Sequence, residues 1–167
     1  MWWCRLLLLL CVPFGAAVAT GITAGDGLPL PPLRWQDGEG ERHQLRGGVD
    51  KPKVLHFWAA WCGPCRKEMP EVLAWKRANP DVELLPLSLD RRMAQASHFV
   101  RKNGLDMPVL LVDEDDAEAL AIPVLPYTLF VSADGRLLGH YPGMAPWLDG
   151  AFSAEVRALL GLPTQAP

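Results

Sequence analysis

The sequence predicts a single α/β domain built around a mixed β-sheet, and three observations point to that class. The chain has 167 residues and half of them are hydrophobic, which is enough for one domain with a sizeable core. Strand-like and helix-like segments alternate along it, as they do in α/β folds. Two cysteines, Cys62 and Cys65, fall between a strand-like and a helix-like segment.

The first half of the domain is expected to hold a hairpin, a buried strand and a long helix. Residues 33–45 have two strand-like arms around a turn rich in glycine, which predicts a β-hairpin. The apolar run 54–58 predicts a short buried strand, and residues 66–77 have the spacing of a helix that begins near Cys62. We expect Pro70 to kink this helix, because proline lacks the amide hydrogen of the helical ladder.

The second half continues the alternation and ends in a second hairpin and a helix. We expect strands at 82–90, 107–112, 127–131 and 136–141, and helices at 93–102, 114–121 and 147–160. The turn 133–135 predicts that the last two strands pair as a hairpin. Pro86 is awkward within a strand, because it cannot donate to the ladder. The predicted order is a hairpin followed by β-α-β-α-β-α-β-β-α.

The N-terminal 19 residues have the pattern of a secretory signal peptide. One positive charge, Arg5, precedes an apolar run, and Ala17-Val18-Ala19 fits a cleavage site. Residues 6–25 carry no charge and are about long enough to span a bilayer, so a retained anchor reaching about residue 24 is the alternative. We therefore expect a periplasmic protein, or one anchored to the inner membrane and facing the periplasm. The remaining boundaries that we expect are a linker at 20–27, the folded domain at 28–162 and a tail at 163–167.

Charge and cysteine content exclude two kinds of protein. The net charge is −3 and no long basic run is present, so we expect no nucleic-acid partner. Of the four cysteines, cleavage after Ala19 would remove Cys4 and Cys11. The remaining pair closes too short a loop to constrain the unfolded chain, so it is not a disulfide scaffold.

The cysteine pair fits redox chemistry better than a metal site. Structural zinc needs four ligands, and the four histidines of the chain are scattered, so we expect no metal. A sulfur at a helix N-terminus faces unpaired N–H groups and the positive end of the helix dipole, which favour the thiolate. Pro64 suits the first turn of such a helix. Cys62 would then be the attacking thiolate and Cys65 the shielded thiol that resolves the mixed disulfide.

The segment Trp61–Cys65 (WCGPC), after HFWAA and before RKEMP, resembles the active site of the thioredoxin superfamily. More narrowly, residues 28–162 resemble the exported TlpA/ResA-type thiol–disulfide oxidoreductases. The hairpin at 33–45 matches their N-terminal extension, and PLSLD through MPVLLVDE matches their inserted α/β segment. The resemblance implies a thioredoxin-like fold with a central mixed sheet flanked by helices and a redox-active Cys62–Cys65 disulfide. We expect no cofactor.

The resemblance also implies a substrate groove. LPYTLFVSADGRLLGHYPG matches the strand and hairpin that begin with a cis-proline in this superfamily, which points to Pro126, with Pro123 as a competing candidate. The backbone of Leu125 would pair with a substrate strand. On the cysteine side, the groove residues that we expect are Trp61, Gly63 and Pro64.

Two further residues are candidates for moving a proton. Glu68 matches the acid of the family's C-x-x-E pattern and is expected to shuttle the proton of Cys65; the alternative is a solvated glutamate that complements the helix dipole. His56 stands where thioredoxins keep a buried carboxylate. It is either a proton acceptor or a satisfied core histidine.

The Gly63-Pro64 dipeptide predicts the direction of electron flow. CxxC proteins range from about −270 mV for thioredoxin to about −120 mV for strong oxidants. This chain carries thioredoxin's own dipeptide and lacks the histidine typical of strong oxidants. We therefore expect a monomeric reductase of disulfides in exported proteins that is recharged by a membrane thiol donor and contributes to redox homeostasis.

The target class best known from the resemblance is apocytochrome c, and two other functions remain open. The first is an oxidase or isomerase of the same fold. The second is a non-enzymatic copper carrier that uses Cys62, Cys65 and a histidine, although carriers of this fold usually space their cysteines by three residues.

Overall fold

A computed structural model describes residues 21–45 and 51–163, so the predicted signal peptide and most of the tail lie outside the described residues. Twelve elements are found there. The strands are β1 (Thr23–Ala24), β2 (Leu33–Gln36), β3 (Arg42–Leu45), β4 (Lys53–Trp58), β5 (Glu83–Ser88), β6 (Leu110–Val112), β7 (Tyr127–Val131) and β8 (Leu137–Pro142). The helices are α1 (Gly63–Ala78), α2 (Met93–Lys102), α3 (Glu114–Ala119) and α4 (Gly150–Leu159). None of these helices is long and apolar enough to cross a membrane.

The described strands form one mixed sheet in the order β1-β8-β7-β4-β5-β6-β2-β3. Strand β4 lies at its centre, parallel to β5 and antiparallel to β7. All six residues of β4 are buried, which explains why this segment is mainly apolar rather than alternating between apolar and polar residues. The predicted α/β class with a central mixed sheet is confirmed.

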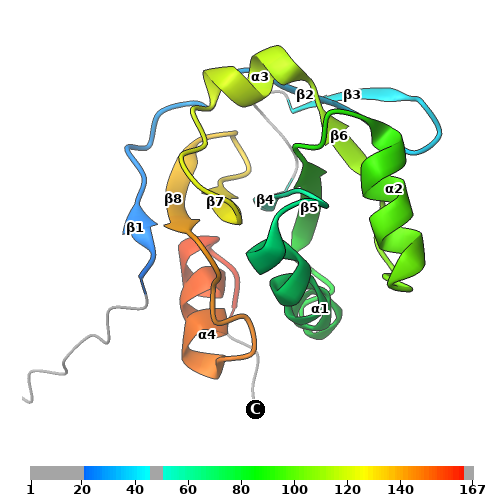
Figure 1. Ribbon diagram of the computed structural model, residues 1–167. Helices are drawn as coiled ribbons and strands as arrows, with labels where there is room; N and C mark the ends of the chain where they lie inside the picture. The colour runs from blue at the N-terminus through cyan, green and yellow to red at the C-terminus, as the bar shows by residue number, and fades with distance from the viewer. Residues whose placement is uncertain (1–20, 46–50, 164–167) are drawn as a thin grey trace, which may run out of the picture.

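Helices cover both faces of this sheet (Figure 1). One hydrophobic core packs the sheet against α1, α2 and α4; its buried members include Val54, Trp58, Met69, Phe99, Phe130 and Phe152. A second core lies on the opposite face, where α3 packs; its buried members include Leu33, Leu55, Leu87 and Leu129. The thioredoxin-like layering that the resemblance implied is therefore present.

The predicted hairpin forms and joins the sheet. Strands β2 and β3 pair from Leu33↔Leu45 to Gln36↔Arg42, and β2 also pairs with β6. Helix α1 continues through Pro70 to Ala78. Pro86 is tolerated in β5 because pairing with β6 begins only at the next residue.

Residues 23–24, which we expected to lie in a linker, form β1 and pair with β8. The next residue, Gly25, donates its N–H to the carbonyl oxygen of Leu138 at 2.8 Å. A Cβ atom at Gly25 would lie 2.3 Å from the carbonyl oxygen of Leu137, so only glycine fits this close approach. The folded domain thus begins several residues earlier than expected.

Candidate active site

The cysteine pair lies at the N-terminus of α1, just after the connection from β4. Strand β4 ends at Trp58, and Cys62 is the extended N-cap residue of α1. Its Sγ accepts a hydrogen bond from the backbone N–H of Cys65 at 3.2 Å. Pro64 lies in the first helical turn, where an amide hydrogen has no intrahelical partner. The sulfur of Cys62 therefore faces the electropositive end of the helix, as the sequence predicts.

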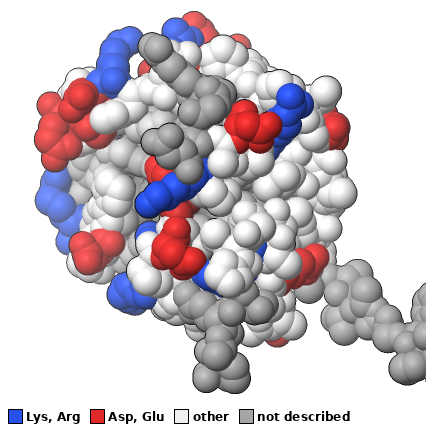
Figure 2. Space-filling view, turned by 180° about the vertical axis from the view of Figure 1, so that it is seen from behind, with Lys and Arg blue, Asp and Glu red and all other residues white. Residues whose placement is uncertain are grey.

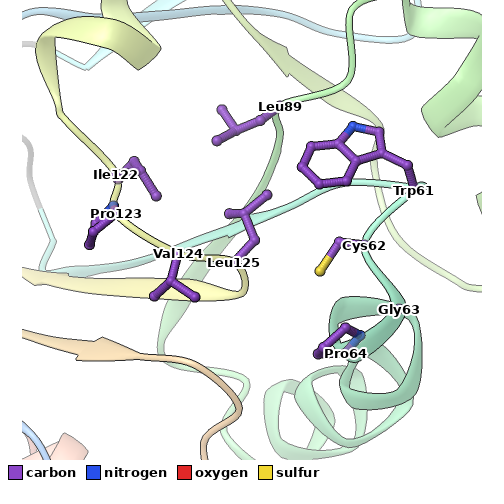
Figure 3. A pocket seen from close by; sticks show the side chains of 9 residues that line it. All are labelled: Trp61, Cys62, Gly63, Pro64, Leu89, Ile122, Pro123, Val124 and Leu125. Carbon is purple, nitrogen blue, oxygen red and sulfur yellow. The ribbon is translucent and has the colours of Figure 1, made fainter.

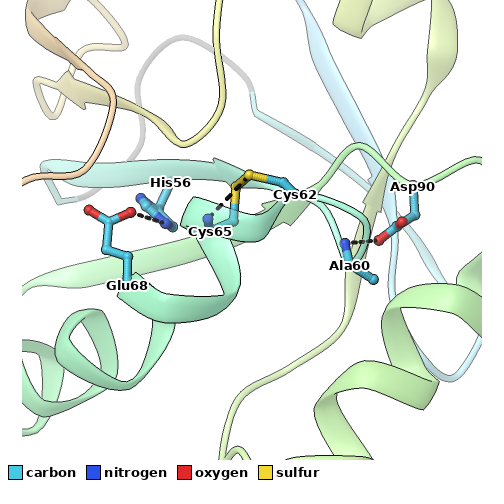
Figure 4. Close-up of a disulfide and its surroundings, with 6 residues drawn as sticks. All are labelled: His56, Ala60, Cys62, Cys65, Glu68 and Asp90. Atoms are coloured by element: carbon cyan, nitrogen blue, oxygen red, sulfur yellow. Dashed lines mark hydrogen bonds and ion pairs between the residues drawn. A yellow bond between two sulfur atoms is a disulfide. The ribbon is translucent and has the colours of Figure 1, made fainter.

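The two cysteines form a disulfide with a Cα–Cα distance of 5.3 Å (Figure 4). Cys62 is 5% exposed, whereas Cys65 is completely buried. A partner sulfur can therefore approach Cys62 and not Cys65. This asymmetry fits the expected division of labour between an attacking and a resolving cysteine.

A cavity of about 500 Å³ opens beside Cys62 (Figure 3). Its lining combines the start of α1 with the segment before β7; the lining residues are Trp61, Cys62, Gly63, Pro64, Leu89, Ile122, Pro123, Val124 and Leu125. None of these side chains carries a charge. The structure therefore brings together the groove residues Trp61, Gly63, Pro64 and Leu125 that we expected to meet there.

The peptide bond between Leu125 and Pro126 is cis, so the competing candidate Pro123 is excluded. Pro126 is buried directly before β7, which runs antiparallel to β4. Its carbonyl oxygen accepts a hydrogen bond from the N–H of Gly143 at 2.9 Å. The sheet thus places the loop before β7 near Cys62, and Leu125 itself lines the cavity.

Glu68 is completely buried one turn after Cys65, so the alternative of a solvated first-turn glutamate is wrong. Its Oε1 accepts hydrogen bonds from the N–H of Ala145 and from Nε1 of Trp147, both at 2.7 Å. Loss of hydration raises the pKa of Glu68 to about 7, with a smaller contribution from the charge of Glu71. A carboxyl group with this pKa can exchange protons near neutral pH.

His56 lies on β4 behind the disulfide and is also completely buried. Its Nδ1 is 3.0 Å from Oγ1 of Thr128, and its Nε2 is 3.7 Å from Oε2 of Glu68 (Figure 4). Burial lowers the pKa of His56 to about 3, because the charged imidazolium would lose its hydration. The ring is therefore neutral at pH 7. Nε2 has no hydrogen-bond partner among the described residues, so His56 is not a fully satisfied core histidine.

Sequence reasoning missed the residues that hold Glu68 and His56 from a distance. Ala145 and Trp147 lie 77 and 79 residues from Glu68, and Thr128 lies 72 residues from His56. No local pattern marks these three residues, because their role follows only from how α4 and β7 pack on α1 and β4. For Trp147, the apolar spacing suggested a helix start instead.

A possible metal-ligand group lies on the N-terminal hairpin. Ligand atoms of Asp37, Glu41 and His43 are within 4.8 Å of one another. Bonds inside the turn account for this proximity: Asp37 accepts from the N–H groups of Glu39 and Glu41, and its other oxygen contacts His43. This group includes no cysteine.

A thioredoxin-like sheet with a helix-capping Cys-Gly-Pro-Cys disulfide beside a cis-proline defines a thiol–disulfide oxidoreductase. Residues 27–139 match the AhpC/TSA family. The chain is 30% identical over 124 residues to thiol-disulfide oxidoreductase ResA of Geobacillus thermodenitrificans, covering 72% of this chain and 68% of that one. It is 26% identical over 141 residues to ResA of Bacillus subtilis, covering 80% and 78%. The chain therefore belongs to the AhpC/TSA family, among the ResA-type thiol–disulfide oxidoreductases.

Solved structures agree with this fold. The thioredoxin domain of a thiol-disulfide oxidoreductase from Bacteroides vulgatus superposes with a TM-score of 0.67 at 22% identity, covering 83% of this chain and 99% of that one. A secreted disulfide oxidoreductase of Mycobacterium tuberculosis, homologous to Escherichia coli DsbE, has a TM-score of 0.59 at 26% identity, covering 72% and 94%.

Proposed function

We propose that this oxidoreductase works as a reductase of disulfides in exported proteins. The observation that carries the proposal is the setting of Cys62, whose sulfur caps α1 and borders an uncharged groove. The helix terminus favours the thiolate, and Gly63-Pro64 is the dipeptide of thioredoxin, a reductant.

The proposed reaction transfers two electrons in two exchanges. The Cys62 thiolate attacks a substrate disulfide, a mixed disulfide forms, and the first substrate sulfur leaves with the electron pair and takes a proton. Cys65 then gives its proton to Glu68 and attacks Sγ of Cys62. The Cys62–Cys65 bond forms, the mixed disulfide breaks, and the second substrate sulfur leaves as a thiolate that takes a proton. A membrane thiol donor returns the dithiol by the reverse exchange.

The proposal includes export, either to the periplasm or to the outer face of the inner membrane. It is supported by the leader-like residues 1–19 and by the relative from Mycobacterium tuberculosis, which is secreted. Among exported substrates, the disulfide of apocytochrome c is the class that the family resemblance favours. The uncharged lining of the groove suits an apolar stretch of chain around the substrate cysteine.

The test is the equilibrium reduction potential of Cys62–Cys65 in residues 20–167, which retain β1. We expect a value of about −250 mV or lower, near thioredoxin's, when the protein is equilibrated with dithiothreitol buffers. A value of about −120 mV would overturn the proposal and make the protein a disulfide donor. An intermediate value of about −180 mV, that of protein disulfide isomerase, would favour an isomerase instead.

A further inference from the structure

Two buried polar atoms face each other behind the disulfide without a partner. They are Nε2 of His56 and Oε2 of Glu68, which are 3.7 Å apart. A buried donor or acceptor that lacks a partner is costly, so such atoms are rare in folded proteins. The distance is longer than a hydrogen bond, yet a hydrogen on either atom would give both atoms a partner.

We propose that His56 and Glu68 share one proton between Nε2 and Oε2, and that His56 changes tautomer when Glu68 gains or loses its proton. His56 would then be a positioning residue that gives Glu68 a hydrogen-bond partner in both of its charge states. The role of this pair in catalysis rests on the proposed thiol exchange at Cys65. The tautomer change itself does not.

The surroundings of Glu68 leave only Oε2 free for this contact. Its Oε1 is already held by the N–H of Ala145 and by Nε1 of Trp147. These two donors come from the segment before α4 and hold Oε1, while Oε2 lies 3.7 Å from Nε2 of His56. The pair is therefore set by tertiary packing and not by the helical spacing of α1 alone.

Thr128 makes the tautomer change possible from the other side of the ring. Its hydroxyl group lies 3.0 Å from Nδ1 and can either donate or accept a hydrogen bond. When Glu68 is protonated, its O–H donates to Nε2 while Nδ1–H donates to Thr128. When Glu68 is ionised, Nε2–H donates to Oε2 while the hydroxyl of Thr128 donates to Nδ1. The change moves the proton of Oε2 to Nε2 and releases the proton of Nδ1 to solvent. The imidazole stays neutral in both states, which agrees with its burial.

The other titratable groups near Glu68 do not provide Oε2 with a hydrogen-bond partner in both charge states. Helix α1 contributes the carboxylate of Glu71 and Cys65, which has a thiol only in the reduced protein, and β4 contributes His56. The segment before α4 contributes the neutral donors of Ala145 and Trp147, and β7 contributes the neutral hydroxyl of Thr128. No cation is in this set, so the ionised carboxylate depends on neutral N–H donors, of which His56 is the only one that can be switched off.

The decisive measurement is nitrogen-15 NMR of the histidine ring in the oxidised protein between pH 5 and pH 9. We expect the His56 signals to exchange between the two neutral tautomers with the midpoint of the Glu68 titration. In the Glu68→Gln variant, the signals should stay constant over this range. One tautomer throughout in the unchanged protein, or an imidazolium signal, would overturn the proposal. A high reduction potential would sink the proposed reductase function but would leave this result unchanged.

Thr128 provides the functional test with a matched rescue. Thr128→Val keeps the shape of the side chain but removes the hydroxyl group that serves both tautomers. We expect the apparent pKa in the pH profile of mixed-disulfide resolution to move by about one pH unit, because the two charge states of Glu68 lose different hydrogen bonds: the one from Nδ1–H to Thr128 when Glu68 is protonated, and the one from Thr128 to Nδ1 when it is ionised. Thr128→Ser should restore the original profile. Equal profiles in all three proteins would show that the hydroxyl group has only a packing role.

Discussion

At the scale of single residues, the most consequential difference is the one between the two sulfurs of the disulfide. Cys62 reaches the surface and Cys65 does not. We therefore expect Cys65→Ser to accumulate a mixed disulfide with a disulfide-bonded substrate peptide, because Cys62 attacks and nothing resolves the product. Cys62→Ser should accumulate almost none. Non-reducing electrophoresis with mass spectrometry separates the two, and equal adduct levels would contradict the assignment.

A substitution at Trp61 tests the role of the groove without disturbing the fold. Its side chain is 67% exposed, and it lines the cavity beside Cys62. We expect Trp61→Ala to raise the KM for a disulfide peptide several-fold while the free energy of unfolding changes by about 0.5 kcal/mol or less. Leu148→Ala is the matched control, because Leu148 is 66% exposed and is not among the residues that line this cavity. Similar KM changes in both variants would argue against a substrate groove at Trp61.

The shifted pKa values of the buried residues Glu68 and His56 also predict how the free energy of unfolding depends on pH. The pKa of Glu68 is raised from 4.5 in the unfolded chain to about 7 in the folded protein. Its contribution to the free energy of unfolding is therefore complete below pH 4.5 and is lost as the pH rises towards 7. The pKa of His56 is lowered from 6.5 to about 3, so its contribution is complete above pH 6.5 and is lost as the pH falls towards 3. Between pH 4.5 and 6.5 these two slopes have opposite signs and cancel.

His56→Gln should expose the slope of Glu68 alone. We expect the free energy of unfolding of this variant, relative to the unchanged protein, to fall by about 1.4 kcal/mol per pH unit between pH 4.5 and 6.5. Glu68→Gln should show the opposite slope. Urea titrations at several pH values measure both, and the same pH dependence in all three proteins would contradict the shifts.

The cysteines and the dipeptide could be predicted from the sequence because they lie in one short motif, whereas the cis-proline was implied by the family resemblance and assigned to Pro126 because it directly precedes a strand. It left open whether Glu68 is solvated, because burial depends on Ala145 and Trp147, which pack from the far end of the chain. The same limit applies to His56, whose partners Thr128 and Glu68 meet it only in the folded sheet.

At the scale of the elements, the start of α4 is the clearest difference between pattern and structure. The apolar spacing predicted a helix from residue 147, but α4 begins at Gly150, after the N-cap residue Asp149. The residues before it form turns that aim Trp147 at Glu68. The spacing was misleading because Trp147 does not lie on the apolar face of a helix. It is buried where it donates to Glu68 and packs against Trp75 and Phe152.

The cap of α4 gives a prediction at this scale. Oδ1 of Asp149 accepts hydrogen bonds from the N–H groups of Ala151 and Phe152 at 2.7 and 3.1 Å. Asp149→Ala should lower the free energy of unfolding by about 1 kcal/mol, as measured by urea denaturation. Asp106→Ala serves as the control, because Asp106 is exposed and has no side-chain hydrogen bond among the described residues. An equal loss in both variants would contradict the capping role.

At the scale of the whole molecule, charge is spread over the surface and absent from the groove. Figure 2 shows positive and negative side chains interspersed over one face, in keeping with the net charge of −3. The groove lining carries no charge. We expect kcat/KM for an uncharged disulfide peptide to change less than about two-fold between low and high salt, because no charged groove steers the substrate. A steep fall with salt would indicate an electrostatic docking surface elsewhere.

The order of elements could be predicted from the alternation of the sequence, whereas the order of strands in the sheet came only from the structure. The hairpin at 33–45 was visible through its turn residues, but its pairing with β6 was not. Strand β1 was missed because two residues have no periodicity to detect, and its place is set by the open edge of β8.

If the leader is retained as an anchor, that short strand limits the distance between the domain and the membrane. Once Thr23 and Ala24 are committed to the sheet, a retained leader has only residues 6–22 to offer the lipid, close to the minimum of about 17 residues for a span. Such a leader would leave no slack between bilayer and protein. The sheet edge formed by β1 would lie close to the lipid headgroups, and the height of the Cys62 sulfur above the membrane would be nearly fixed. A cleaved chain would be free to diffuse to partners at any distance.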